Sequence, residues 1–173
     1  MIRVRMADYE IELAKQIGLK RQEENRKLTK ENVSLYAENG PFADQIGMLG
    51  ELAIAKHFNV CPDLDVVCRR GSWDGLLYGW RYDAKTTHYK TGRLLGPDKK
   101  NPDVEIYILC IAPVKDFEWK KNKTVSIVGW SHEFELYNEK NVGDLGRGKH
   151  FEMDQDELEK DFQRLDYLRN TIY

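Results

Sequence analysis

The sequence predicts an α/β protein in which a central mixed β-sheet is flanked by helices and a β-hairpin on that sheet carries the functional residues. Two apolar runs, VEIYILCIA at residues 104–112 and TVSIVGW at residues 124–130, have the composition of buried strands. The stretch DQIGMLGELAIAKHF at residues 44–58 has the spacing of a largely buried helix. With 41% hydrophobic and 32% charged residues, the 173 residues suffice for one domain, 1–173, with its own core.

The N-terminal part is expected to contain a short strand and a long helix. Residues 2–6 (IRVRM) alternate apolar and basic side chains, which is typical of an edge strand. Residues 8–32 have a helical pattern with a break near Gly18, and their second half is nearly all polar. That half is either a solvated helix or an arm that contacts DNA or a second subunit, which leaves room for a homodimer. The domain divides into an N-terminal strand and helical extension (1–40), a core (44–130) and a C-terminal helical part (131–173).

The helix expected at residues 44–58 carries one acidic side chain on its apolar stripe. Asp44 is the predicted N-cap of this helix, and Glu51 falls on its apolar face. A buried carboxylate without a partner is strongly unfavourable, so Glu51 needs a compensating group. The alternatives are contact with water, an ion pair with Arg69 or Arg70, or a place in a metal site.

Residues 71–87 (GSWDGLLYGWRYDAKTT) are predicted to form a β-hairpin with a two-residue loop at Tyr78-Gly79. This register places Asp74 directly across from Asp83, and strand alternation places Asp83 and Lys85 on one face. Like charges directly opposite one another destabilise a sheet, and a divalent cation bound by carboxylate oxygens is the obvious compensation. The alternative is a solvated hairpin whose charges only keep the strand soluble.

The order of these residues resembles a known nuclease signature. A glutamate on a helix, Glu51, precedes an aspartate, Asp74, and then an Asp-x-Lys sequence that closes a strand at residues 83–85. This arrangement resembles the PD-(D/E)XK nuclease superfamily over roughly residues 44–130. The resemblance implies a restriction-endonuclease-like core of the kind found in small phage and bacterial members, with the site on the hairpin of a mixed sheet.

The resemblance also implies a site that binds Mg²⁺, with Mn²⁺ as a substitute, and hydrolyses phosphodiester bonds. In the superfamily, two acids and a backbone carbonyl bind the metal, the lysine serves the attacking water, and the helical glutamate completes the site. Carried over to this chain, the catalytic residues are Glu51, Asp74, Asp83 and Lys85, and the metal ligands are Asp74, Asp83, the Ala84 carbonyl and Glu51.

The chain departs from the pattern in two ways. Trp73 stands where the signature has proline, and the segment after Thr87 does not read as the helix of the common core.

The net charge of the chain is −2, so binding to nucleic acid must depend on local basic patches. Residues 81–100 contain six basic and two acidic side chains, a net charge of +4 beside the candidate site. Residues 151–173 contain seven acidic and three basic side chains and are expected to face away from phosphate. The residues expected to contact nucleic acid are Arg69, Arg70, His88, Lys90 and Arg93.

Four further segments read as ordinary secondary structure. Residues 65–70 (DVVCRR) are a predicted strand that leads into the hairpin, and residues 93–95 are a second short strand. Ser131 is expected to cap a short helix, and residues 156–170 have the pattern of an amphipathic helix.

The stretch GDLGRGKH at residues 143–150 fits the phosphate loop of many NTPases. However, His150 stands where that loop has serine or threonine, and no helix is expected to begin at Lys149. A glycine turn is therefore the preferred interpretation of this stretch.

The leading hypothesis is a magnesium-dependent deoxyribonuclease, with RNA left open as a substrate. No run of 18 apolar residues and no signal-peptide core is present, so we expect a cytoplasmic protein of bacterial or phage origin without a membrane partner. One alternative is a catalytically inactive nucleic-acid-binding module on the same fold, and another is a protein-interaction domain with an incidental acidic pair. The full set of three acids and a lysine favours catalysis, because a binding module does not need carboxylates near phosphates.

Overall fold

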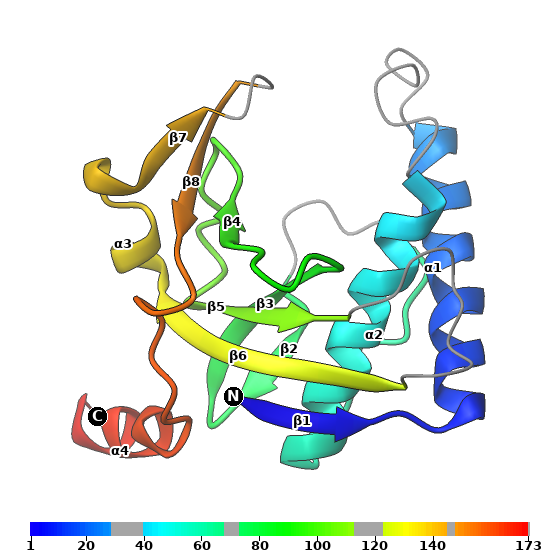
Figure 1. Cartoon of the computed structure of the whole chain (residues 1–173), viewed down its shortest axis with the longest axis horizontal. Coiled ribbons are helices and arrows are strands. Elements are labelled where there is room, and N and C mark those ends of the chain that lie inside the picture. The colour runs from blue at the N-terminus through cyan, green and yellow to red at the C-terminus, as the bar shows by residue number, and fades with distance from the viewer. Residues whose placement is uncertain (29–39, 68–72, 113–122, 145–147, 173) are drawn as a thin grey trace.

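The computed structural model describes residues 1–28, 40–67, 73–112, 123–144 and 148–172. They form a mixed five-stranded sheet of order β1-β6-β5-β3-β2 and a three-stranded antiparallel sheet of order β4-β8-β7 (Figure 1). The strands are β1 (Ile2–Arg5), β2 (Gly75–Leu77), β3 (Trp80–Thr87), β4 (Leu94–Gly96), β5 (Ile106–Ile111), β6 (Thr124–His132), β7 (Val142–Asp144) and β8 (Lys149–Met153). The helices are α1 (Asp8–Leu28), α2 (Gly40–Phe58), α3 (Glu133–Leu136) and α4 (Gln163–Ile172), with a 3-10 turn η1 (Glu139–Asn141).

The two apolar runs form β5 and β6 in the larger sheet, as predicted. β5 is buried along its whole length because both faces of the sheet are covered. α1 and α2 lie side by side against one face, and α3 with the second sheet covers the other (Figure 1). β3 and β5 run parallel, while the other neighbours in this sheet are antiparallel. The predicted α/β class, with a mixed sheet flanked by helices, is confirmed, and β1 is the expected edge strand.

The connection between the parallel strands β3 and β5 contains no helix in residues 88–105, all of which the structure describes. It contains β4 instead, which pairs with β8 in the second sheet. Parallel neighbours are usually joined through a helix that covers the sheet. Here the second sheet covers that face. The expectation that no helix follows Thr87 is therefore confirmed.

The C-terminal part differs from the helical segment expected at residues 131–173, because it also contains β7 and β8. α4 begins at Gln163 rather than near residue 156. The residues before it form turns and an isolated bridge between Trp130 and Glu159, which ties this segment to the end of β6. The buried side chain of Leu158 thus packs against the second core from irregular backbone and not from a helix.

The strand predicted at residues 65–70 is wrong where it can be checked: residues 65–67 are not part of a strand, and residues 68–70 lie outside the described residues. Lys149 begins β8, so the expectation that no helix begins at this residue, as an NTPase phosphate loop would require, is confirmed. In the part of the chain that the structure describes, no helix combines the length and hydropathy needed to cross a membrane.

α1 continues through Gly18, where a break was predicted, because this glycine lies against α2. A Cβ at Gly18 would be 2.6 Å from the Cα of Gln45, so only glycine allows the two helices to approach this closely. α2 begins at Gly40, and Asp44 therefore lies inside the helix and is not its N-cap. Pro41 falls in the first turn, where its missing N–H would have no intrahelical partner.

Gly50→Ala is expected to destabilise the protein by about 1–3 kcal/mol. A Cβ at this position of α2 would lie 2.0 Å from Oγ1 of Thr86 and 3.2 Å from Cβ of Cys110, so the helix would be pushed away from the sheet. Gly47→Ala in the same helix is the matched control, because a Cβ there meets nothing within 4 Å. It should stabilise the protein by about 0.5–1 kcal/mol through better helix propensity. Urea unfolding of both variants checks the prediction, and equal effects would contradict it.

Candidate active site

β2 and β3 form the predicted hairpin, with its loop at Tyr78-Gly79. Both loop residues have positive φ, 50° and 81°, which is the type I′ geometry that follows the natural twist of paired strands. The tyrosine occupies a position where glycine or asparagine is more usual, which is why the local sequence signal is moderate. The register is the predicted one and pairs Leu77 with Trp80, Leu76 with Arg81, and Gly75 with Tyr82.

Asp74 closes the hairpin at the point where the ladder ends. Its N–H donates to the carbonyl of Tyr82 (2.8 Å), and its carboxylate Oδ2 accepts from the N–H of Ala84 (2.7 Å). This side-chain contact replaces the predicted strand pair of Asp74 and Asp83 and fixes the carboxylate beside β3. Burial raises the pKa of Asp74 well above its usual range, and the nearby carboxylates of Glu51 and Asp83 raise it further.

Asp83 and Lys85 lie on the same face of β3, as predicted. Nζ of Lys85 is 2.7 Å from the Asp83 carboxylate. Burial lowers the pKa of Lys85, but the charges of Asp83 and Asp74 outweigh burial and the net shift is upward. Lys85 therefore carries a positive charge at neutral pH, and its ammonium lies 6.0 Å from the ring centroid of Tyr107.

The backbone carbonyl of Ala84 faces the side of β3 on which Asp74 lies. The carbonyls of Arg81 and Thr87 accept hydrogen bonds from the β5 side, so the odd-numbered residues of β3 point their backbone groups toward β5. The N–H and C=O of Ala84 point the opposite way, and the N–H already contacts Asp74. β2 begins only at Gly75, so no described strand runs alongside this carbonyl. The Ala84 oxygen thus points to the same side of β3 as Asp74, and its role as a metal ligand stays a prediction.

Glu51 lies on the buried face of α2, as predicted, and is bound by Arg21 of α1. Arg21 donates to both carboxylate oxygens of Glu51, at 2.8 and 3.0 Å. It also donates to the carbonyls of Asp63 (2.8 Å) and Asp65 (3.0 Å). Glu51 is only 6% exposed; burial raises its pKa, and Arg21 opposes that shift. The ion pair therefore joins α1, α2 and the segment that follows α2.

The three acids approach one another without forming a single metal-binding cluster. In the described ranges, no group of three or more His, Cys, Asp or Glu side chains is arranged to hold a metal ion. The expectation that Glu51, Asp74 and Asp83 grip one ion together is not met. The donors that fit a divalent cation are the carboxylates of Asp74 and Asp83 with the Ala84 carbonyl, since Mg²⁺ prefers hard oxygen ligands.

The basic segment at residues 81–100 is largely neutralised by acids from other parts of the chain. The guanidinium of Arg93 lies 2.5 Å from Glu152 and 2.6 Å from Asp154, so it is already engaged in two ion pairs. The expected contact of Arg93 with phosphate is therefore not supported by its position. Other basic residues of this segment are also paired, Arg81 with Glu105 and Lys100 with Glu133.

Two of the other expected nucleic-acid contacts lie just beyond β3. His88 is half-buried, with its ring 5.6 Å from that of Phe42, and Lys90 is exposed. These two residues follow directly on the strand that carries the candidate site, and their contact with nucleic acid stays a prediction. Arg69 and Arg70 lie outside the described residues.

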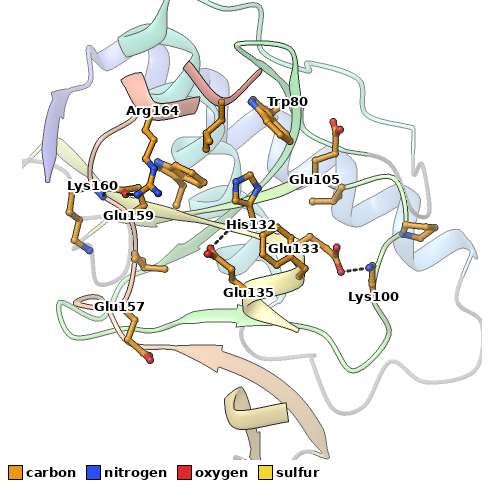
Figure 2. A pocket seen from close by; sticks show the side chains of 16 residues that line it. Trp80, Lys100, Glu105, His132, Glu133, Glu135, Glu157, Glu159, Lys160 and Arg164 are labelled. Carbon is orange, nitrogen blue, oxygen red and sulfur yellow. Dashed lines mark hydrogen bonds and ion pairs between the residues drawn. The ribbon is translucent and has the colours of Figure 1, made fainter. Parts of the chain in front are cut away.

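A pocket of about 880 Å³ lies near the start of β3 and is lined in part by Trp80 and His132 (Figure 2). None of the four candidate catalytic residues lines this pocket. Two ion pairs lie within its lining, Glu133 with Lys100 and Glu159 with Arg164. The pocket is therefore separate from the acids of the hairpin.

Comparisons with protein-family models, with curated proteins and with solved structures find no match for this chain. The resemblance to PD-(D/E)XK nucleases therefore stays a prediction. What supports it is the local geometry: two acids, a backbone carbonyl and a charged lysine meet on one hairpin.

Arg21 is the site residue that the sequence interpretation missed. A signal for it exists, because Ile11, Ala14 and Gly18 form the buried stripe of α1 and Arg21 follows at the next helical step. A basic residue on a buried stripe requires an acidic partner. The identity of that partner depended on how α1 packs against α2.

Asp74→Asn is expected to raise the thermal midpoint in EDTA at neutral pH. Burial raises the folded-state pKa of Asp74 above its unfolded value of about 4. The folded protein thus binds this proton more tightly, and wild type loses stability as the pH rises from about 4 toward neutrality. Asparagine stays neutral and can still accept from Ala84. Melting curves between about pH 4 and 8 test this, and a gap that does not widen with pH would contradict it.

Proposed function

We propose that this protein is a magnesium-dependent nuclease of the PD-(D/E)XK type that hydrolyses phosphodiester bonds in DNA. The observation that carries the proposal is the hairpin site, where Asp74 is anchored on Ala84 and Asp83 is paired with Lys85. Half-buried acids beside a fixed positive charge suit phosphate hydrolysis, because a metal ion and a lysine can share the negative charge of the reacting phosphate. A merely solvated hairpin does not need to anchor Asp74 on the N–H of Ala84.

Asp74, Asp83 and the Ala84 carbonyl would hold Mg²⁺ or Mn²⁺. These donors fit such an ion, because the half-buried Asp74 lies near other carboxylates and a cation would offset their repulsion. When bound, Mg²⁺ supplies Lewis-acid chemistry toward the phosphate. The proposed restriction-endonuclease-like core is consistent with a mixed sheet that has a helix-borne acid on one side of the hairpin.

Lys85 contributes a fixed positive charge to the proposed reaction. Because it is an ammonium at neutral pH, it donates hydrogen bonds and stabilises the negative charge that develops on the phosphate, and it does not take a proton from water. Asp83 holds the ammonium in place at 2.7 Å. Glu51, bound by Arg21, ties α2 to α1 and to the segment that follows α2.

A cleavage panel tests the proposed function. Labelled single-stranded, duplex and branched DNA and an RNA are incubated with the protein in Mg²⁺, Mn²⁺ or EDTA. We expect cleavage of at least one DNA in Mg²⁺, no cleavage in EDTA and none by Asp83→Asn. Gel-shift binding without cleavage would favour the inactive nucleic-acid-binding module. If the protein neither binds nor cleaves any of these nucleic acids, the hypothesis of a protein-interaction domain is favoured.

A further inference from the structure

Tyr82, in the middle of β3, has a hydroxyl without a hydrogen-bond partner among the residues that the structure describes. Its side chain is fully buried, with 0% exposure. Leaving a buried polar group unpaired is unfavourable, because the group has given up its hydrogen bonds to water. Most buried hydroxyls in native proteins are therefore paired, and an exception calls for a physical reason.

The Tyr82 hydroxyl lies next to the candidate site. The ring of Tyr82 crosses over Gly75, its partner in the hairpin ladder, and a Cβ at Gly75 would lie 2.6 Å from the hydroxyl oxygen. Gly75 directly follows Asp74, so the missing Cβ leaves the space that the hydroxyl occupies. Burial raises the pKa of Tyr82, and the negative charges of Asp74 and Glu51 raise it further.

The chemistry of these groups is complementary. A phenol at neutral pH donates a hydrogen bond, whereas an ionised carboxylate only accepts. Oδ2 of Asp74 accepts from Ala84, and the two oxygens of an ionised carboxylate have lone pairs for further donors. A water between the hydroxyl, Asp74 and Glu51 would have the two to four polar partners that an ordered buried water requires.

We propose that Tyr82 is a positioning residue for the candidate metal site: its hydroxyl donates to a water that Asp74 and Glu51 also bind, and thereby orients the Asp74 carboxylate toward a divalent cation. The inference rests on the proposed function. Removing a side chain that hydrogen-bonds to a metal ligand, and not to the metal itself, typically changes metal affinity or activity by about 10–100-fold.

Tyr82→Phe removes only the hydroxyl and tests this role. We expect the affinity for Mn²⁺ and Mg²⁺, measured by calorimetry on the full chain, to weaken by about 10–100-fold. Without metal, the thermal midpoint should fall by at most about 4 °C, because the variant loses no more than one water-mediated hydrogen bond. Thr86→Val is the matched control, since it removes a second unpartnered buried hydroxyl from the same face of β3, next to Gly50. Its metal affinity should equal that of wild type.

The outcomes separate this inference from the proposed function. If wild type binds the metal and Tyr82→Phe binds it equally well, the inference is wrong and the proposed function stands. A much larger fall in the metal-free midpoint of Tyr82→Phe would also overturn the inference, because the hydroxyl would then have a direct structural partner in the protein. If wild type binds neither metal, both the proposed function and the inference fail.

Discussion

Lys85→Met is expected to lower the rate of Mg²⁺-dependent DNA cleavage by about 100–1,000-fold while the fold is retained. Lys85 is the charged partner of Asp83, at 2.7 Å, and lies beside Asp74 in the hairpin site. Its removal takes a positive charge away from the position where negative charge would develop on the phosphate. Methionine keeps a similar unbranched apolar stem, so the half-buried stem of the lysine is replaced without a large cavity.

The rate of cleavage at saturating substrate measures this effect, and circular dichroism checks the fold. Lys140→Met is the matched control, because the Lys140 side chain is 66% exposed on η1, and we expect it to keep full activity.

Lys85→Arg distinguishes two roles of the lysine in the reaction. Arginine keeps the charge but cannot lose its proton, so residual activity indicates electrostatic stabilisation, whereas complete loss indicates a base. Full activity of Lys85→Met would rule out a catalytic role for this side chain.

Arg21→Met should destabilise the protein by about 3–5 kcal/mol, the largest stability effect that we expect from a single substitution. The variant leaves the carboxylate of Glu51 buried at 6% exposure without the guanidinium that binds both of its oxygens. It also removes the hydrogen bonds that Arg21 donates to the carbonyls of Asp63 and Asp65. Urea unfolding at neutral pH measures the change in the free energy of unfolding.

Two variants test whether the burial of the charge causes this loss. The double variant Arg21→Met/Glu51→Leu should recover most of the stability, because replacing both members of a buried pair with apolar residues is often nearly neutral. Arg164→Met breaks an exposed pair with Glu159 and should cost at most about 1 kcal/mol. A cost for Arg21→Met no larger than that of Arg164→Met would contradict the prediction.

The same double variant decides the role of Glu51. The sequence assigned this acid to the metal site, whereas the structure gives both of its oxygens to Arg21. If Glu51 is structural, the double variant retains cleavage. If cleavage is lost although stability is recovered, Glu51 takes part in the reaction.

The strands and the hairpin could be predicted because they depend on residues close together in the chain. The apolar runs at β5 and β6 need only their own composition to be recognised as buried strands. The two-residue loop at Tyr78-Gly79 sets the register of its own strands, and alternation along β3 places Asp83 and Lys85 on one face. Each of these conclusions depends only on residues within one short segment of the chain.

The ionic partners could not be predicted in this way. Arg21 and Glu51 are separated by 30 positions, and Arg93 and Glu152 by 59. The chain offers 27 basic and 29 acidic residues, so spacing alone cannot select the pair that forms. The packing of α1 on α2 brings Arg21 to Glu51, and the pairing of β4 with β8 brings Arg93 to Glu152.

The sequence alone determined three features of this protein: the class of fold, the hairpin, and the placement of an acid and a lysine on one strand face. Residues close together in the chain impose these features through backbone geometry. Only the tertiary structure decided that Glu51 is held by Arg21, that Asp74 is anchored on Ala84 and that the Tyr82 hydroxyl lies beside them. Those contacts arise when separate elements pack together and remove charged and polar groups from water, which makes the choice of partner a matter of three-dimensional position.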